Sequence, residues 1–416
     1  MKRLGVHRLN FLLLWSGQFV SQLGDSIFHV ALVWYALRLP DSKWVSGLIL
    51  AMGYLPPLLF SLPVGAMVDR LDRKSILITC AALQALVVGM IPLADRFGAL
   101  TPATLMVFAF LLSSGTSFAI PARDSLIPWL VTAEQMHQAN SYVRISSQMA
   151  FMAGPLVASL ATAQLGLIHL FSIDSVTFGL NACFLWLVWV PLRPRNRTRR
   201  TRRDPLSLPA RDKGTWGDIR EGLHHAWEDR RLRGLMLLTA LNNLVIMGPA
   251  MLGMPVFVRE VLGLGEAGVK TYTWLLSTCF AGMMLSSVLI GMLGRGLPKG
   301  KLIVWGSILD ALTILPFFYI RALPALFLAM FLHGLTVPLI SVPRVTLIQE
   351  IVPDDRRGRM FSLLNLAVIG FTALSMILTG VLSEFWHMDR IFLIAGILGT
   401  LGGLLGMGCR ELWKTR

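Results

Sequence analysis

Four polar side chains recur at helical spacing within the first apolar stretch, residues 10–37. Gln18, Gln22, Asp25 and His29 are 4, 3 and 4 residues apart, so a helix places them on one face. Ionisable side chains inside membrane helices are costly, and they mark pathways for ions, protons or substrates. We therefore predict that Asp25 takes up and releases a proton, with His29 one turn away as its modulator. The alternative is a structural hydrogen bond from this stripe to a neighbouring helix.

Later apolar stretches contain a second set of polar side chains. These are Asn242, Asn243, Asp310 and His333. Amides and an imidazole can orient a polar substrate, or they can join helices through hydrogen bonds, and the sequence leaves both open. With the first stripe, they form the predicted set for substrate binding and proton coupling.

The composition requires that membrane helices position these residues. Of 416 residues, 55% are hydrophobic and 15% charged, and the mean hydropathy is +0.64. A soluble protein of this size could not bury so much apolar surface, so an all-α integral membrane protein is predicted. Runs of about 20 apolar residues, enough to span the hydrocarbon, predict twelve transmembrane helices: 10–37, 46–68, 75–95, 103–120, 139–164, 168–192, 232–258, 268–294, 300–320, 323–343, 361–384 and 389–410.

The one long hydrophilic segment divides these helices into two groups. We predict an N-terminal six-helix bundle over residues 1–192 and a C-terminal six-helix bundle over 232–416, joined by a cytoplasmic linker over 193–231 with a short amphipathic helix near 218. This topology puts 31 of the 38 Lys and Arg residues on the side of the termini and 7 on the other. The bias predicts cytoplasmic termini and a multi-pass protein of the bacterial cytoplasmic (inner) membrane.

The net charge of +15 is therefore a topology signal. The Arg-rich run at 193–203 lacks interleaved aromatic residues and follows a membrane helix, which favours contact with anionic lipid over nucleic acid. The four cysteines form no CxxC pair, so no disulfide, metal site or cofactor is predicted. The sequence has neither the phosphate-binding loop of an ATP-driven pump nor a clustered nucleophile and base, so we predict no enzyme.

Residues 65–74, GAMVDRLDRK, concentrate charge between two apolar runs. The chain must leave the membrane, turn and re-enter here. A glycine lets helices approach closely, a carboxylate can bind helix-end amides, and basic groups hold the turn in the cytoplasm. The stretch resembles the signature loop of the major facilitator superfamily, G-x-x-x-D-R-x-x-R-K, although an ordinary basic loop is the alternative. The resemblance implies a cytoplasmic gate formed by Gly65, Asp69, Arg70, Arg73 and Lys74.

Two short sequence repeats relate the two groups of helices. Residues 291–301 repeat the loop at 65–74 in degraded form, at an offset of 226 (291 − 65). Residues 346–352 repeat 125–131 at an offset of 221 (346 − 125). Two parallel six-helix repeats, with the site between them, are typical of a rocking transporter.

The resemblance extends over essentially the whole chain, and it looks like the bacterial exporter branch that includes macrolide efflux proteins and siderophore exporters. It rests on Trp15–Gln18 with Gly24-Asp25, Pro121–Asp124, Gln135 with Ala139–Ser141, Asp218–Gly222 and Pro353–Ser362. Gly154-Pro155 resembles the helix-5 kink of antiporters, or is a simple packing notch. Exporters of this type often carry an arginine in helix 4, where this chain has Leu112.

The resemblance also implies where the polar residues lie. Asp174 and Asp310 would sit on peripheral helices in buried pairs, and Arg144 would gate by pairing with a loop carboxylate. Apolar candidates for the cavity wall, if they form a site at all, suit a bulky amphiphile. These are Phe28, Trp34, Met247, Phe257 and Phe331.

The predicted protein is a monomeric secondary active transporter. It would export amphiphilic or lipophilic small molecules by alternating access, in exchange for protons. A lysophospholipid flippase is the alternative, because the Gly24-Asp25 pair also resembles lysophospholipid transporters. A non-transporting receptor or scaffold is the remaining class, but it would not require the polar stripe or a duplicated gating loop.

Overall fold

The computed structural model describes residues 2–39, 42–60, 64, 67–68, 71–132, 134–189, 227–293, 296 and 298–415. Within these residues the chain forms helices and connecting loops, with no strand. The N half, as we call it, contains α1 (Lys2–Arg38), α2 (Lys43–Met52), α3 (Leu55–Phe60), α5 (Arg73–Arg96), α6 (Pro102–Leu130), α7 (Met136–Leu165) and α8 (His169–Leu187).

The C half begins with a run of consecutive helical pieces over Arg230–Val261 and contains the remaining helices. They are α10 (Arg230–Gly248), η2 (Pro249–Gly253), α11 (Met254–Val256), η3 (Phe257–Val261), η4 (Gly265–Ala267), α12 (Gly268–Leu293), α13 (Lys299–Leu312), α14 (Pro316–Tyr319), α15 (Leu323–Ile351), α16 (Asp354–Phe385), α17 (Met388–Met407) and α18 (Arg410–Trp413).

Ten helical segments in the described part of the chain are long and apolar enough to cross a membrane. Two further helices, α1 and α7, have 37 and 30 residues but carry polar side chains such as Asp25 and Arg144 along their length. Both pack inside the bundle, α1 against α8 and α7, and α7 also against α12. The all-α membrane fold is confirmed, and these segments together are consistent with the twelve predicted helices.

Two helices extend well past their predicted ends. α6 continues to Leu130 instead of stopping near residue 120, and α15 continues to Ile351 instead of residue 343. Each helix contains two internal prolines, Pro121 and Pro128 in α6 and Pro338 and Pro343 in α15, and proline lacks a backbone N–H and interrupts helix hydrogen bonding. Burial overrides that penalty: Leu126 in the extension of α6 and Leu347 in that of α15 are buried against neighbouring helices. The predicted second helix is instead broken into α2 and α3 ahead of Pro56.

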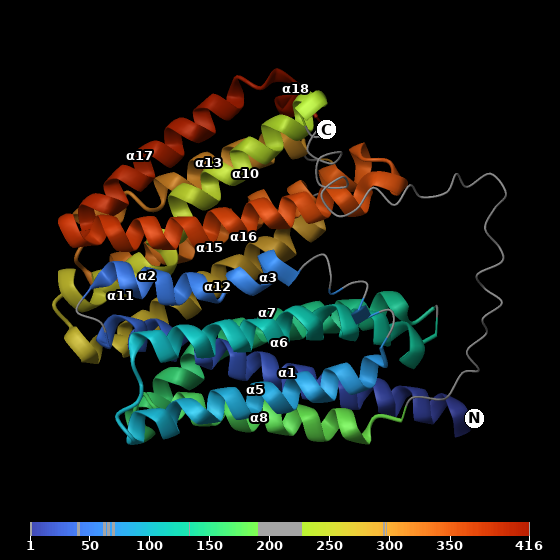
Figure 1. Cartoon of the computed structure of the whole chain (residues 1–416). Coiled ribbons are helices and arrows are strands. Elements are labelled where there is room, and N and C mark those ends of the chain that lie inside the picture. The colour runs from blue at the N-terminus through green and yellow to red at the C-terminus, as the bar shows by residue number, and fades with distance from the viewer. Residues whose placement is uncertain are drawn as a thin grey trace.

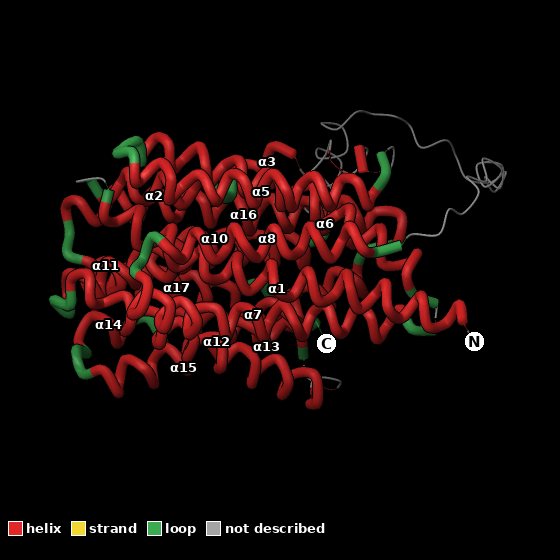
Figure 2. Tube along the Cα trace, turned by 90° about the horizontal axis from the view of Figure 1, so that it is seen from below, coloured by secondary structure: helices red, strands yellow, loops and turns green. Residues whose placement is uncertain are grey.

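Figure 1 shows the two halves side by side, with both termini toward the right of the view. The two halves meet along two helix pairs, α2 with α16 and α7 with α12, and each pair has one helix from each half. The view from below in Figure 2 shows that the helices run along a common direction. Among the described residues, all hydrogen bonds and ion pairs between the halves lie at the end away from the termini. We call this the joined end.

Candidate functional site

A polar cluster around Asp310 joins three helices of the C half. The Thr336 hydroxyl on α15 donates a 2.6 Å hydrogen bond to Asp310 Oδ1, and the Asn242 amide on α10 donates to Oδ2 at 3.2 Å. His333 Nδ1 lies 3.1 Å from Asp310 Oδ1, and the Asp310 side chain is 1% exposed. The structure thus brings together three residues that the sequence analysis selected separately. We call these four residues the Asp310 cluster.

Close helix packing holds this cluster in place. A Cβ atom on Gly334 would overlap the backbone of α12, so α15 and α12 are in direct main-chain contact. The Thr313 hydroxyl also lies 3.1 Å from His333 Nδ1, so this one ring nitrogen has two polar neighbours, Asp310 and Thr313. A buried carboxylate and imidazole at this distance can share a proton or form an ion pair. In the described part of the chain, the side-chain hydrogen bonds and ion pair of Asp310 are all to residues of its own half.

A pair of acids lies in the N half between α1 and α8. Asp174 on α8 is 0% exposed and accepts a 3.1 Å hydrogen bond from Thr177, while its Oδ2 has no partner among the described residues. Asp25 on α1 is half-buried, and it directly follows Gly24, which packs against Asp174. Gly24 permits this approach, because a Cβ atom there would overlap Thr177 and Asp174. Two neighbouring carboxylates repel each other in a low-dielectric site unless a proton or cation offsets their charge.

The other members of the α1 stripe have different surroundings. Gln18 Nε2 donates to Asn181 Oδ1 on α8 at 3.4 Å. Gln22 and His29 are half-buried, and within the described chain Gln22 Oε1 has no hydrogen-bond partner. Gln18 thus makes the hydrogen bond to a neighbouring helix that the sequence left as the alternative, because Gly17 brings α8 against this side of the stripe. The sequence analysis missed Asp174 as the neighbour of Asp25, although Gly24 beside Asp25 was a signal for close packing.

The repeat offsets place a neutral counterpart of the Asp310 cluster in the N half. The offset of 226 relates Gln84 to Asp310 (310 − 84), and the offset of 221 relates Leu112 to His333 (333 − 112). The buried Gln84 amide donates to the Leu112 carbonyl at 3.1 Å and to the Thr116 hydroxyl at 2.9 Å. The helix-4 position that lacks the exporter arginine thus corresponds to a histidine in the other half.

Two further predicted residues join neighbouring helices. Asn243 accepts a 3.2 Å hydrogen bond from Thr372 on α16. α7 continues through Gly154 and Pro155, and a Cβ atom on Gly154 would overlap Ser26 of α1. The glycine therefore lets α7 pack against α1 beside Asp25, which favours the packing notch that the sequence left open.

Between the halves lies a cavity of about 440 Å³, walled by α7 on one side and by α12 and α15 on the other. The rings of Phe151 and Phe280 face each other across the halves, with centroids 5.8 Å apart. Arg144 and Gln349 supply polar groups to the wall. In the described part of the chain Arg144 forms no ion pair, so its predicted pairing with a loop carboxylate is not formed in this structure.

Three of the apolar candidates for the cavity wall belong to the packed core. Phe28, Trp34 and Phe257 are 6%, 1% and 0% exposed and lie in one buried cluster that includes both halves. Met247 and Phe331 are half-buried. The first three sit toward the joined end, where the halves bury each other's apolar surface.

The sequence analysis missed the polar contacts of the joined end. Lys43 Nζ lies 2.6 Å from Glu260 Oε2, and the Ser42 hydroxyl donates to Glu384 Oε1 at 2.5 Å. The Trp34 indole also donates across the halves, to a carboxylate oxygen. Opposite charges at helix ends in different halves were the available signal. We call Ser42, Lys43, Glu260 and Glu384 the joined-end gate.

The predicted cytoplasmic gate is described only in part. Outside the described residues lie Gly65, Asp69 and Arg70, as do the Arg-rich run at 193–203 and the predicted amphipathic helix near 218. The Arg73 guanidinium lies 5.4 Å from the Trp129 ring centroid, and Lys74 Nζ donates to the Trp186 carbonyl at 2.9 Å. Arg73 and Lys74 thus attach the start of α5 to α6 and α8.

Two helical halves with a cavity between them, together with the family match, identify the chain as a membrane transporter of the major facilitator fold. The chain belongs to the family described as transmembrane secretion effector, whose model matches residues 6–413.

Named relatives cover almost the whole chain. Macrolide efflux protein A of Streptococcus pyogenes is 24% identical over 402 residues, which is 96% of this chain and 95% of that protein. Multidrug efflux pump Tap of Mycobacterium tuberculosis is 22% identical over 393 residues, or 93% of this chain and 90% of that protein. The crystal structure of nucleoside transporter NupG superposes with a TM-score of 0.76 at 14% identity, covering 96% of this chain and 99% of NupG.

Proposed function

We propose that this transporter exports amphiphilic or lipophilic small molecules from a bacterial cell in exchange for protons. The acid pair Asp25–Asp174 is the observation that carries the proposal. It is a polar site inside the helix bundle, with one half-buried carboxylate and one carboxylate oxygen that lacks a hydrogen-bond partner among the described residues. The two relatives named for macrolide and multidrug efflux support export as the direction.

The proposed proton site works through the charge of the acid pair. With both groups ionised, the pair attracts a cationic substrate or a proton, because neither carboxylate offsets the other. A proton on one carboxylate oxygen removes that repulsion and lowers the attraction for a cation. Binding of a proton therefore favours release of a cationic substrate, and loss of the proton favours rebinding.

The proposed substrate class follows from the cavity between the halves. Its wall combines apolar side chains, among them Phe151, Phe280, Met283 and Met284, with the polar side chains of Arg144, Gln148, Ser287, Ser341, Thr346 and Gln349. A wall that offers both kinds of surface suits a bulky amphiphile. Arg144 lies at this wall and would orient an acceptor group of the substrate.

In alternating access, one end of the bundle would open while the other end closes. The joined-end gate closes one side of the bundle, and charge distribution predicts that the termini, at the opposite end, are cytoplasmic. In the proposed cycle, the joined-end contacts break and residues 65–74 close the other side.

The test is transport by the purified chain in proteoliposomes. Counterflow against a macrolide, a lipophilic cationic dye, a siderophore and a lysophospholipid would identify the substrate class, and an imposed pH gradient would measure coupling. We expect counterflow of the macrolide or the dye, and accumulation that depends on the gradient. Movement of the lysophospholipid alone, without response to the gradient, would support the flippase instead.

A further inference from the structure

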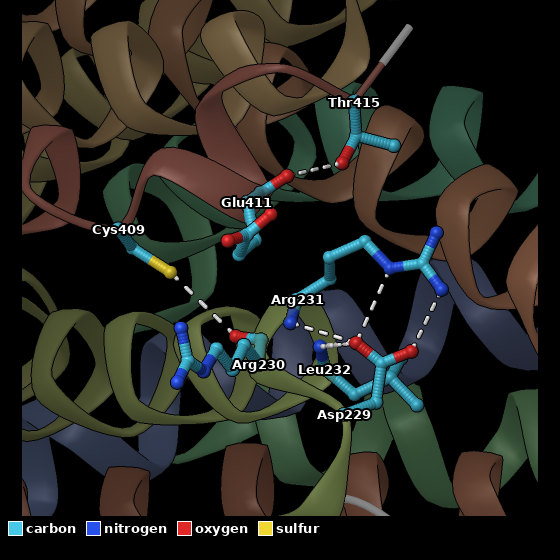
Figure 3. Close-up of polar contacts among 7 residues, drawn as sticks. All are labelled: Asp229, Arg230, Arg231, Leu232, Cys409, Glu411 and Thr415. Carbon is cyan, nitrogen blue, oxygen red and sulfur yellow. Dashed lines mark hydrogen bonds and ion pairs between the residues drawn. The ribbon is translucent and has the colours of Figure 1, made fainter.

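A second pocket lies on the C half, away from the acid pair and the central cavity. It is a groove of about 540 Å³ between the first turns of α10 and the last turns of α17, extending to the start of α18. Figure 3 shows the polar end of this region, where α10 begins beside the C-terminal residues. The Cys409 thiol donates to the Arg230 carbonyl at 3.6 Å and links the two sides of the groove.

Glycines form the apolar floor of the groove. A Cβ atom on Gly402 would overlap the Leu241 side chain, and one on Gly234 would press against Cys409 Sγ at 2.6 Å. α10 and α17 therefore pack closely and leave a shallow channel. Leu237 and Leu405 border it with exposed fractions of 52% and 77%. Apolar side chains this exposed in a membrane helix are suited to contact with acyl chains.

The polar end of the groove carries excess positive charge. Arg230, Arg233 and Arg410 line it, and in the described part of the chain their guanidinium groups form no hydrogen bond or ion pair. The neighbouring Arg231 is different, because Asp229 Oδ2 lies 2.8 Å from its Nη2. Glu411 is the one acidic group of the lining, and its charge acts on Arg231. Three guanidinium groups are thus left for an anion.

We propose that this groove binds one anionic phospholipid. The phosphodiester would be held by Arg230, Arg233 and Arg410, and one acyl chain would lie along the glycine and leucine floor. Guanidinium groups match phosphate oxygens in geometry and charge, and the apolar floor selects a lipid over a free phosphate. The site is separate in sequence from the Arg-rich run at 193–203, and the packed helices α10 and α17 form its acyl channel.

The direct test is native mass spectrometry of the purified full chain in a neutral detergent. Phosphatidylglycerol, phosphatidylcholine and glycerol 3-phosphate would be titrated separately. We expect one tightly bound phosphatidylglycerol, with phosphatidylcholine at least tenfold weaker and no binding or competition by glycerol 3-phosphate. Equal binding of both lipids would overturn the charge assignment, and competition by glycerol 3-phosphate would overturn the lipid assignment.

Two variants localise the binding. The substitutions R230Q, R233Q and R410Q together should weaken phosphatidylglycerol binding about tenfold or more. R96Q, K270Q and R390Q remove the same charge at exposed positions of the joined end and should leave binding unchanged. Equal affinity in these two triple variants would overturn the proposal.

A third variant tests the acyl channel without changing charge. A Cβ atom on Gly406 would meet Leu238 at 3.4 Å, an ordinary contact, so Gly406→Leu can fold while its side chain fills the groove. We expect a severalfold loss of phosphatidylglycerol affinity with an unchanged melting temperature in the lipid-free protein. Unchanged affinity would place the acyl chain elsewhere and contradict the channel.

Discussion

The two halves hold their buried acids in different ways. In the C half, Asp310 is 1% exposed, and both of its oxygens have polar partners. In the N half, Asp174 keeps one oxygen without a hydrogen-bond partner among the described residues, and Asp25 beside it is half-buried. A carboxylate with both oxygens hydrogen-bonded is suited to positioning helices. A pair of acids with one unbonded oxygen and one half-buried carboxylate is suited to exchanging a proton.

The repeat sharpens this contrast. At the position of Asp310 the N half has Gln84, and at the position of His333 it has Leu112. Gln84 still bonds across its helix pair, to Leu112 and Thr116. A neutral amide therefore makes the same kind of interhelical contact, so packing alone does not require a charge at this position. We infer that the Asp310 cluster fixes the C half and that the acid pair carries the proton.

The largest expected effect comes from Asp25→Asn. The variant removes the half-buried proton site, so accumulation driven by a pH gradient should fall at least tenfold while energy-independent exchange remains. Flux in proteoliposomes with and without the gradient is the measurement. Asp95→Asn, at an exposed acid at the end of α5, is the matched control and should transport normally. Full gradient-driven accumulation by Asp25→Asn would remove the acid pair from coupling.

The next effect should be on stability of the C half. Asp310→Leu leaves His333, Thr336 and Asn242 without their shared acceptor, and loss of one member of a buried pair costs about 3–5 kcal/mol. The double variant Asp310→Gln with His333→Leu copies the N-half arrangement and should recover most of that loss. Melting temperatures of the purified variants measure both. A double variant as unstable as the single one would mean that the halves are not equivalent here.

A smaller effect is expected at the joined-end gate. Lys43 and Glu260 are partly exposed, and such ion pairs are worth about 0–1 kcal/mol. Lys43→Gln should therefore shift the balance of conformations only severalfold toward opening of this end. Double electron–electron resonance distances between spin labels on α2 and α16 would measure the shift. The charge swap Lys43→Glu with Glu260→Lys restores an ion pair and should restore the original distances. No shift in Lys43→Gln would exclude the pair from gating.

The smallest effect concerns the start of the C half. Asp229 caps α10, accepting from the Arg231 amide at 2.8 Å, and its bond to the Arg231 side chain holds the pKa of Asp229 below its usual value. This contribution is present above the unfolded pKa, near 4, and is lost as pH falls through the folded pKa. Asp229→Ala should cost about 1 kcal/mol at neutral pH.

Thermal unfolding of Asp229→Ala at neutral and acidic pH checks this sign. The difference from the unsubstituted protein should shrink as the pH is lowered toward the folded pKa. Asp95→Ala, at an exposed acid at the end of α5, provides the charge-matched control. A difference that grows at low pH would contradict the cap.

The fold could be predicted because it depends on properties that can be read directly from the sequence. Hydrophobic length predicted the helices, and the offsets of 226 and 221 predicted the repeat. The prediction failed at the ends of α6 and α15, where burial of residues such as Leu126 and Leu347 outweighs the cost of internal prolines.

The candidate site was predicted only one residue at a time. Asn242, Asp310 and His333 were selected because polar groups are rare in apolar stretches, but their mutual contacts depend on how α10, α13 and α15 pack. The same holds for Asp174, whose nearness to Asp25 depends on Gly24 at a helix crossing. Single-helix periodicity cannot predict which faces meet.

The most direct test of the central claim is proton release on substrate binding by the detergent-solubilised protein. A pH indicator in weak buffer would record it for the substrate identified by counterflow. We predict proton release by the unsubstituted protein and by the double variant Asp310→Gln with His333→Leu, and none by Asp25→Asn. Release that persists in Asp25→Asn and disappears in the double variant would assign the proton to the Asp310 cluster and contradict this account.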